Sequence, residues 1–294
     1  MNDKELKHDA VVLEASISII LFGLIAVIVK YISANAYTIG IARLVITVVC
    51  MFLYLCFKGG RFLPTTNQLP ALIGMGFFFG VHWLFYFLSI KLSTASIAVI
   101  ALASYGIHLL ILGWIFRNTK PSWFDILALS FAIFGTLAII PEFSLKNNTT
   151  LGVIFGLISA FCFACLPILH QKYREIPTTT RASGQFFFAM VFFLFFLPLS
   201  HWDLPAVDWA ALIILAVLCT FIAHSLWIKV TSKLSTLTSS LIYYLIIPIS
   251  MLLSHFFLDE VMTISKLSGG SLILLANVIG IYSQWKRKSI LNLN

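Results

Sequence analysis

Ten long apolar segments follow one another along the chain, each close to the length of one membrane crossing. A helix needs about 20 residues to cross the ~30 Å hydrocarbon core of a bilayer. The segments are apolar throughout and do not alternate, so we expect helices, which satisfy their own backbone hydrogen bonds in lipid, and not the strands of a barrel. We therefore predict an all-α integral membrane protein with ten transmembrane helices, at residues 11–29, 38–57, 69–90, 95–116, 122–140, 151–171, 183–200, 209–228, 236–257 and 267–285.

The composition leaves no room for a sizeable soluble domain. Of the 294 residues, 60% are hydrophobic and 10% are charged, and the mean hydropathy is +1.01. Soluble domains contain about 25% charged residues, so lipid is the natural solvent for this chain. The net charge of +8 comes largely from short loops between apolar runs, where basic residues set membrane topology. We therefore expect the lipid bilayer, and no nucleic acid, as a partner.

The basic residues also predict the orientation of the chain. With the N-terminus inside, most of the 19 Lys and Arg residues fall in inner segments, as the positive-inside rule requires. Both termini are therefore expected in the cytoplasm. The inner basic residues are Lys4, Lys7, Lys58, Arg61, Arg117, Lys120, Lys172, Arg174, Arg181, Lys229, Lys233, Lys286, Arg287 and Lys288.

An internal repeat becomes visible when the sequence is shifted by 142 residues. Three matches share this offset without gaps: Lys30-Tyr31 with Lys172-Tyr173, His82 with His224, and residues 91–94 with residues 233–236, both Lys-Leu-Ser-Thr. The first half covers residues 10–141 and the second 150–286, with tails at 1–9 and 287–294. Each half has five spans, an odd number, so the two halves enter the membrane from opposite sides. Many secondary transporters use such an inverted-topology repeat and bind their substrate near the midplane, between the halves.

With these features the chain resembles the drug/metabolite transporter (DMT) superfamily, in its ten-helix exporter branch of EamA-domain proteins. Besides the two halves and Lys30-Tyr31, the resemblance rests on residues 243–248, Tyr-Tyr-Leu-Ile-Ile-Pro, and residues 257–260, Phe-Leu-Asp-Glu. It implies an EamA-like five-helix repeat in each half. It also implies proton-coupled or facilitative movement, often export, of amino acids, nucleotide-linked compounds, vitamins or drugs. We expect a multi-pass protein of a bacterial cytoplasmic (inner) membrane.

The first half departs from the family pattern at two positions. Pro248 corresponds to Gly106, and Glu260 corresponds to Asn118. A broken helix around Pro248 is therefore expected in the ninth span. Whether the fourth span has the same break stays open, although Gly106 would soften the helix there.

His82 and His224 are the first candidates for substrate contact or proton relay. They lie past the middle of spans three and eight, which the repeat makes equivalent, so inversion places His82 towards the outer half and His224 towards the inner half. Polar side chains within a membrane usually face the bundle interior or a water-filled cavity, and a neutral imidazole both donates and accepts hydrogen bonds. The alternative is a packing role, with each histidine bonded to a neighbouring helix.

Aromatic side chains cluster near these histidines and predict a cavity suited to an amphiphilic solute. Trp83 and Tyr86 flank His82, and Tyr105 lies one turn before His108 in span four. In the second half the comparable candidates are Trp227 and Tyr244. The alternative for Trp and Tyr is an interfacial belt, which the position of Trp227 near a span end favours.

Three charged residues in or near spans are further candidates. Arg43 lies about five residues into span two, where it would either attract a carboxylate or phosphate or extend to the outer interface. Lys30, at the end of span one, has the same two interpretations. Glu14 is the candidate for proton coupling, but it lies in the first turn of span one, where a helix N-terminus favours an acidic residue in any case.

The sequence contains no catalytic, metal-binding or ATP-binding motif that we recognise, so we expect no enzyme activity, metal or cofactor. We predict a secondary transporter that exports a small polar or zwitterionic metabolite, an amino acid or a relative. The alternatives are proton-coupled efflux of cations or drugs, a membrane-embedded enzyme, and a non-transporting subunit. Small residues at Gly152, Gly156 and Ala160 predict close helix packing within one chain or between two chains of a homodimer.

Overall fold

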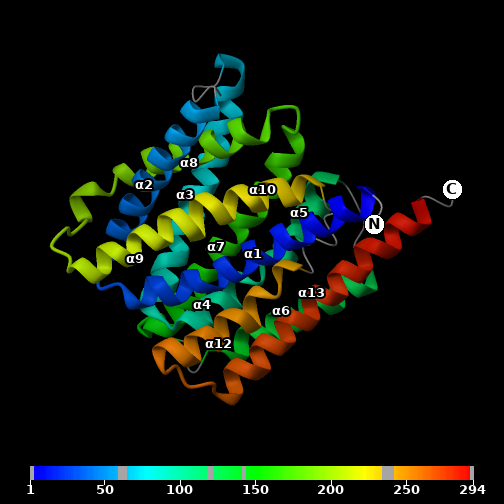
Figure 1. Ribbon diagram of the computed structural model, residues 1–294. Coiled ribbons are helices and arrows are strands. Elements are labelled where there is room, and N and C mark those ends of the chain that lie inside the picture. Colours follow the sequence, from blue (N-terminus) through cyan, green and yellow to red (C-terminus); the bar gives the residue numbers. More distant parts are fainter. Residues whose placement is uncertain (1–2, 59–64, 118–121, 141–143, 234–241, 292–294) are drawn as a thin grey trace.

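The computed structural model describes residues 3–58, 65–117, 122–140, 144–233 and 242–291. Within these ranges the chain folds into helices joined by short turns (Figure 1), which confirms the predicted all-α class. Residues 234–241 lie outside the described ranges, and with them the start of the ninth predicted span and part of the second Lys-Leu-Ser-Thr motif. Arg61 and Lys120 of the predicted inner loops lie outside them as well.

Within the described residues, ten successive helical spans are present. Seven helical stretches are long and apolar enough to cross a membrane, two apolar helices are shorter, and the tenth span is the 17-residue helix α8. The first half consists of α1 (Asp3–Tyr31), α2 (Ala36–Lys58), a short 3₁₀ turn η1 (Thr66–Gln68), α3 (Leu69–Leu92), α4 (Ala95–Leu102) with α5 (Tyr105–Arg117), and α6 (Trp123–Ala138). The second half consists of α7 (Asn148–Lys172), α8 (Thr178–Leu194), a 3₁₀ turn η2 (Leu197–Leu199), α9 (Ala206–Ala216) continued by the π-helix η3 (Val217–Ile222) and by α10 (Ala223–Lys233), α12 (Ile246–Leu258) and α13 (Ile264–Leu291).

The helices start at residues that satisfy their free backbone N–H groups, and they keep an apolar outer surface. The side chain of Thr94 accepts from Ile97 N at the start of α4, and that of Asn147 accepts from Thr149 N at the start of α7. Large apolar side chains such as Phe57 and Phe134 remain exposed on the outside of the bundle. A water-soluble monomer rarely exposes so much apolar surface, so this surface is the one that lipid covers.

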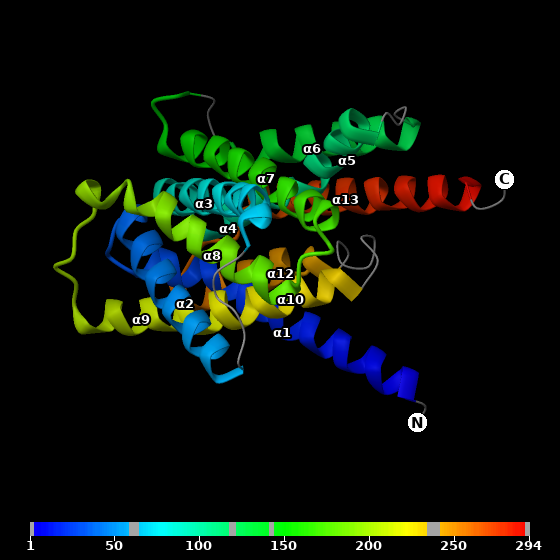
Figure 2. The ribbon, with the colours of Figure 1, turned by 90° about the horizontal axis from the view of Figure 1, so that it is seen from above.

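The two halves are interleaved rather than side by side, and their contacts repeat. In the first half α1 packs on α10 and α12, and in the second half the equivalent helix α7 packs on α3, α4 and α5. The last helices of the two halves, α6 and α13, pack on each other, as Figures 1 and 2 show. The start of α1 and the end of α13 lie on the same side of the molecule (Figure 2). This arrangement of two inverted five-helix repeats confirms the predicted architecture.

Spans four and nine are both broken, at corresponding places. The first break is the turn at residues 103–104 between α4 and α5, and the second is the turn at 244–245 before α12. Pro248 has no N–H for the carbonyl four residues earlier, so a helix cannot continue unchanged through this position. At the first break, the carbonyl of Ala103 is freed from the helix, and Nδ2 of Asn277 in α13 donates a 3.0 Å hydrogen bond to it. The open question about span four is thereby answered: it breaks without a proline.

The small residues of α7 are used within the chain. A Cβ at Gly152 would lie 2.6 Å from the Cβ of Ser93, and one at Gly156 would lie 2.6 Å from the Cβ of Ala101. Their close approach therefore brings α7 against the end of α3 and against α4. The homodimer stays a prediction.

Candidate functional site

A small cavity lies between the two halves, close to both helix breaks. Its volume in this structure is ≈ 10 Å³, about the space that a single water molecule needs. Equivalent spans of the two halves contribute to it: one, three and four from the first, and six, eight and nine from the second. The residues that line the cavity are Phe22, Ile25, His82, Trp83, Tyr86, Leu102, Phe163, His224, Tyr243 and Ile246.

His82 of α3 is anchored on the neighbouring helix α7. Its Nδ1 lies 3.1 Å from the carbonyl oxygen of Ser159 and 2.7 Å from the hydroxyl oxygen of the same residue. The Ser159 hydroxyl also reaches the carbonyl oxygen of His82 at 2.9 Å. The imidazole ring stacks on Phe163, with ring centroids 4.7 Å apart. These contacts fix the ring at the cavity wall.

His224 of α10 faces the same cavity but has a less polar surrounding. Its ring lies against Phe22 at 4.5 Å, Phe79 at 5.1 Å and Trp83 at 5.4 Å between centroids. Its Nε2 is buried without a hydrogen-bond partner. The two histidines therefore meet at one cavity, from opposite halves of the chain, but only His82 is held by a hydrogen bond that the structure shows.

Arg43 of α2 is completely buried, with an exposed fraction of 0%. Its guanidinium carbon lies 3.6 Å from the centroid of a Trp83 ring, and its Nε donates to the hydroxyl of Thr220 in the π-helix η3. The alternative that Arg43 extends to the outer interface is therefore wrong. Thr220 lies in the stretch of π-helix, where its hydroxyl donates a hydrogen bond to the carbonyl oxygen of Leu215, five residues earlier. The hydroxyl oxygen is thereby oriented to accept the hydrogen bond from Arg43 Nε.

Five polar atoms around this region are buried and lack a hydrogen-bond partner. They belong to four side chains: both terminal nitrogens of Arg43, Nε1 of Trp83, the hydroxyl of Tyr86 and Nε2 of His224. The arginine and tryptophan nitrogens can only donate. Buried polar groups are normally paired, and each unpaired one costs about 1–3 kcal/mol. The group is consistent with a site that a solute rich in hydrogen-bond acceptors completes.

Three of the predicted aromatic residues lie next to the cavity rather than on its wall. Tyr105 and Tyr244 are buried with ring centroids 5.8 Å apart, and Tyr105 lies 4.8 Å from the lining residue Tyr243. Trp227 is 8% exposed and packs against Phe22 and Tyr243, so the interfacial belt favoured for it is wrong.

His108 is not among the residues that line the cavity. Its Nδ1 lies 3.1 Å from Ser104 O, and its ring packs at 5.9 Å from that of Phe161. It belongs to the packing of α5 on α7. Tyr105 and His108 both lie on α5 and both contact α7, at Phe163 and Phe161, but only Tyr105 contacts residues that line the cavity.

Glu14 does not lie at the cavity. It forms an ion pair with Lys229 of α10, at the end of the bundle that carries the termini. The lining of the described cavity holds no carboxylate. Among the described residues, no three His, Cys, Asp or Glu side chains gather closely enough to hold a metal ion.

Sequence reasoning missed the apolar part of the lining: Phe22, Ile25, Leu102, Phe163 and Ile246, with Tyr243 noted only as a neighbour. The sequence carries no signal that separates these residues from the lipid-facing ones, because both groups are apolar residues within spans. The helix break beside Tyr243 and Ile246 was the one available indication.

The EamA-like transporter family model matches residues 10–140 and again residues 150–282. The chain therefore belongs to this family of membrane transporters, which confirms the resemblance to the DMT superfamily. A solved structure, described only as "Crystal structure of protein", is similar with a TM-score of 0.67 and 15% identity, covering 92% of this chain and 96% of the other. At that identity the similarity shows the fold alone. No curated protein matches the sequence.

Proposed function

We propose that this protein is a secondary transporter that carries a small zwitterionic metabolite with a carboxylate group, an amino acid or a relative, by alternating access. The observation that supports this most directly is the group of unpartnered polar atoms at Arg43, Trp83, Tyr86 and His224. A carboxylate offers two oxygens with about four acceptor sites. It would supply the acceptors that Trp83, Tyr86 and His224 lack at the cavity wall, whereas Arg43 does not line the cavity and would act through its charge from behind Trp83.

The positive charge of Arg43 supports an anionic group on the solute. A central arginine costs about 2.5–3.5 kcal/mol on insertion scales, and such residues usually have a functional role. Trp83 both lines the cavity and stacks on the guanidinium group, so the charge lies one aromatic ring away from the solute. Attraction over this distance is strong because the surrounding bundle has a low dielectric constant.

The aromatic walls suit the ammonium group of the same solute. Rings of Phe163, Tyr86 and Tyr243 line the cavity, and a cation over such a ring gains about 0.5–2 kcal/mol. A zwitterion would therefore place its carboxylate near Trp83, Tyr86 and His224 and its ammonium group against the rings of Phe163 and Tyr243.

We further propose a bacterial cytoplasmic membrane, cytoplasmic termini and export as the direction of transport. The distribution of basic residues supports the orientation. Lys58 ends α2, Lys229 lies near the end of α10, and Lys286 lies near the end of α13, and all three belong to the predicted inner segments. The export direction rests on the resemblance to the exporter branch.

Counterflow in proteoliposomes tests the proposal. Vesicles are loaded with amino acids, nucleosides or organic cations, one class at a time, and entry of the matching labelled solute is followed. We expect accumulation with amino acids and loss of accumulation in Arg43→Gln. The control is Lys172→Gln, which removes an exposed cation and leaves transport unchanged. Equal transport by Arg43→Gln would refute the carboxylate site.

Efflux of an organic cation is the second candidate, supported by the aromatic lining. It predicts accumulation with cations in the same counterflow panel and loss of proton coupling in Glu14→Gln. The position of Glu14, in an ion pair with Lys229 away from the cavity, makes it the weaker candidate. An enzyme is disfavoured because the chain belongs to a transporter family.

A further inference from the structure

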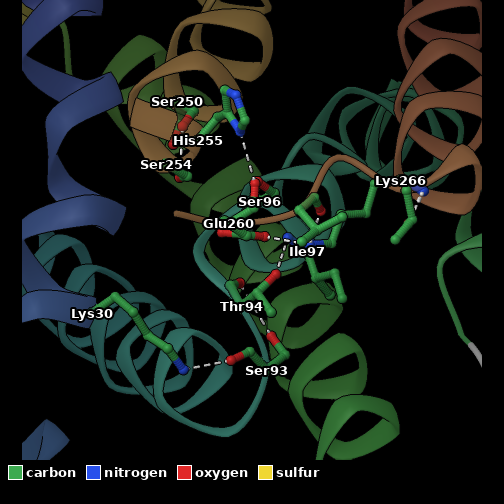
Figure 3. Close-up of polar contacts among 12 residues, drawn as sticks. Lys30, Ser93, Thr94, Ser96, Ile97, Ser250, Ser254, His255, Glu260 and Lys266 are labelled. Carbon is green, nitrogen blue, oxygen red and sulfur yellow. Dashed lines mark hydrogen bonds and ion pairs between the residues drawn. The ribbon is translucent and has the colours of Figure 1, made fainter. Parts of the chain in front are cut away.

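Glu260 is a buried carboxylate at the end of the bundle opposite the termini, in the loop between α12 and α13. Its side chain is 8% exposed. One oxygen, Oε1, accepts a 2.7 Å bond from Lys266 Nζ, and the other, Oε2, accepts a 3.3 Å bond from the backbone N–H of Ser96 (Figure 3). Both oxygens of the carboxylate are therefore engaged, although the loop that carries it lies at the edge of the molecule.

These contacts join the two halves of the chain. Glu260 and Lys266 belong to the second half, whereas Ser96 lies in the first turn of α4 in the first half. The first N–H groups of a helix have no partner within the helix and favour a negative charge. Thr94 caps the same helix, and Figure 3 shows Glu260 beside Thr94 and Ser96. Glu260 therefore completes the N-terminus of α4 from across the repeat boundary.

The other end of α4 reaches the cavity. The helix has only eight residues, and its last residue, Leu102, lines the cavity just before the break of span four. A helix this short moves as a rigid unit. A shift of its first turn, where Glu260 binds, therefore also shifts Leu102 at the cavity wall. Moving Glu260 away would free α4 at the end where the path must open.

Two further sets of contacts close the same end. Lys30 of α1 donates to the carbonyl oxygens of Ile90 at 3.0 Å and Ser93 at 2.6 Å, at the end of α3. The backbone N–H of Ser33, after α1, donates to Asp208 of α9 at 2.9 Å. The Lys30 contacts stay within the first half and fix α1 to α3. Asp208 and Glu260 instead connect the two halves.

We propose that Glu260 is the latch that holds this end of the transport path closed, and that its contact with α4 must break before the cavity can open there. The inference rests on the proposed transport function, and Glu260 acts through α4 without contacting the solute. In the proposed orientation this end faces the outside, so the structure has its outer side closed.

Side-specific labelling of a cysteine in the cavity tests the latch. The reporter is Ile25→Cys on the cavity wall, in a chain whose five native cysteines are replaced by serine or alanine. A membrane-impermeant thiol reagent is added from the side opposite the termini. Because Glu260→Gln removes a hydrogen-bonded charge that holds the closed state, we expect it to raise the labelling rate about tenfold or more. Glu260→Asp should restore part of the closure.

The matched control is Glu14→Gln, which removes the acid of an ion pair at the opposite end and should not raise labelling from this side. If Glu260→Gln does not reach the membrane, Lys266→Gln removes the ion-pair partner that positions Glu260; it should raise labelling less than Glu260→Gln, because the bond to Ser96 stays. An unchanged labelling rate in folded Glu260→Gln and Lys266→Gln would overturn the latch. A raised rate without counterflow of any solute would uphold the latch and remove only the proposed function.

Discussion

His82 and His224 occupy equivalent positions of the two repeats, yet their surroundings differ. Ser159 of α7 holds His82 through its carbonyl and hydroxyl oxygens, whereas Nε2 of His224 is buried without a partner. The residue that corresponds to Ser159 in the first half is Ile17, which has no polar side-chain group to offer. The repeat therefore supplies the same position twice, and the local sequence leaves one histidine open to a solute.

Arg43 shows the same difference between the halves. At the offset of 142, its counterpart is Gln185 of α8, which is buried and bonds to His170 Nε2 at 2.8 Å. The first half thus places a charge where the second places a neutral amide that is already paired. Under the proposed mechanism, the pseudo-symmetric backbone would alternate between two states, and the asymmetric side chains would bind the solute.

Removing the charge of Arg43 has the largest expected effect. We expect Arg43→Gln to raise the KM for a zwitterionic substrate about 10–100-fold, because a hydrogen bond or close attraction to a charged group is worth about 1.5–3 kcal/mol. Arg43→Lys keeps the charge but loses the planar stacking on Trp83, so it should be intermediate. Counterflow at a series of substrate concentrations measures both variants.

Thermal unfolding in detergent distinguishes a binding role of Arg43 from a structural one. Replacing a buried, unpaired charge by an apolar side chain of similar size is often neutral or stabilising. Arg43→Met should therefore unfold at the wild-type temperature or above it while transport is lost. A large drop in the unfolding temperature would instead assign Arg43 to the packing of α2 on η3.

Substitutions of His82 and His224 should have different effects in the same transport and unfolding assays. We expect His224→Gln to weaken substrate affinity about tenfold, because its unpartnered Nε2 is available to a solute. His82→Gln should mainly lower stability, by about 1 kcal/mol, through the loss of its bonds to Ser159. KM and unfolding temperature, measured on both variants, decide the point, and equal effects of the two would remove the proposed asymmetry.

Much of the architecture could be predicted from the sequence, because each membrane-spanning helix can be recognised from its own run of apolar residues. Span length, basic loops and the exact offset between His82 and His224 depend only on local residues. The cavity could not be outlined in the same way. Phe22 lines it and Phe57 faces outward, but both are phenylalanines within apolar runs. Only packing against the other half distinguishes them.

Contacts between distant residues escaped prediction for the same reason. Arg43 was recognised as a candidate, but its complete burial depends on Thr220, 177 positions later in the chain. Glu260 was noted only as part of a family pattern, because its partner Ser96 lies 164 positions earlier. The break in span four also gave a weak signal, since Gly106 stands where the second half has proline.

The break in span four can be tested through Gly106. A Cβ at this position would lie 1.7 Å from the Tyr244 hydroxyl and 2.5 Å from Asn277 Oδ1, so Gly106→Ala must displace groups of the second half. We expect a loss of about 1–3 kcal/mol in stability. Gly113→Ala on the same helix is the control, since a Cβ there meets no atom within 4 Å. It should be neutral or stabilising by about 0.5–1 kcal/mol.

The smallest expected effect is that of pH on the rate at which the cavity opens at the Glu260 end of the bundle. It compares this end, held by Glu260, with the end that carries the termini. Burial alone would raise the pKa of Glu260, but the bonds from Lys266, Thr94 and Ser96 outweigh it and lower the pKa below 4.5. A lowered pKa means that the carboxylate stabilises the closed state above its ordinary pKa and loses this contribution as the pH falls through the lowered value.

Because only the thiolate reacts, every labelling rate is divided by the rate of a fully exposed cysteine with the same reagent at the same pH. This relative labelling of Ile25→Cys from the side opposite the termini should stay slow from about pH 7 to about pH 5 and increase only under stronger acid. The other charged or titratable groups near Glu260 are Lys266 of α13, Lys30 of α1 and His255 of α12, which contacts the Glu260 carbonyl. Glu260→Gln keeps all three and removes the carboxylate, so its labelling should be fast and independent of pH over this range. A wild-type rate that rises already near neutral pH, and in the same way in Glu260→Gln, would assign the response to one of these neighbours instead.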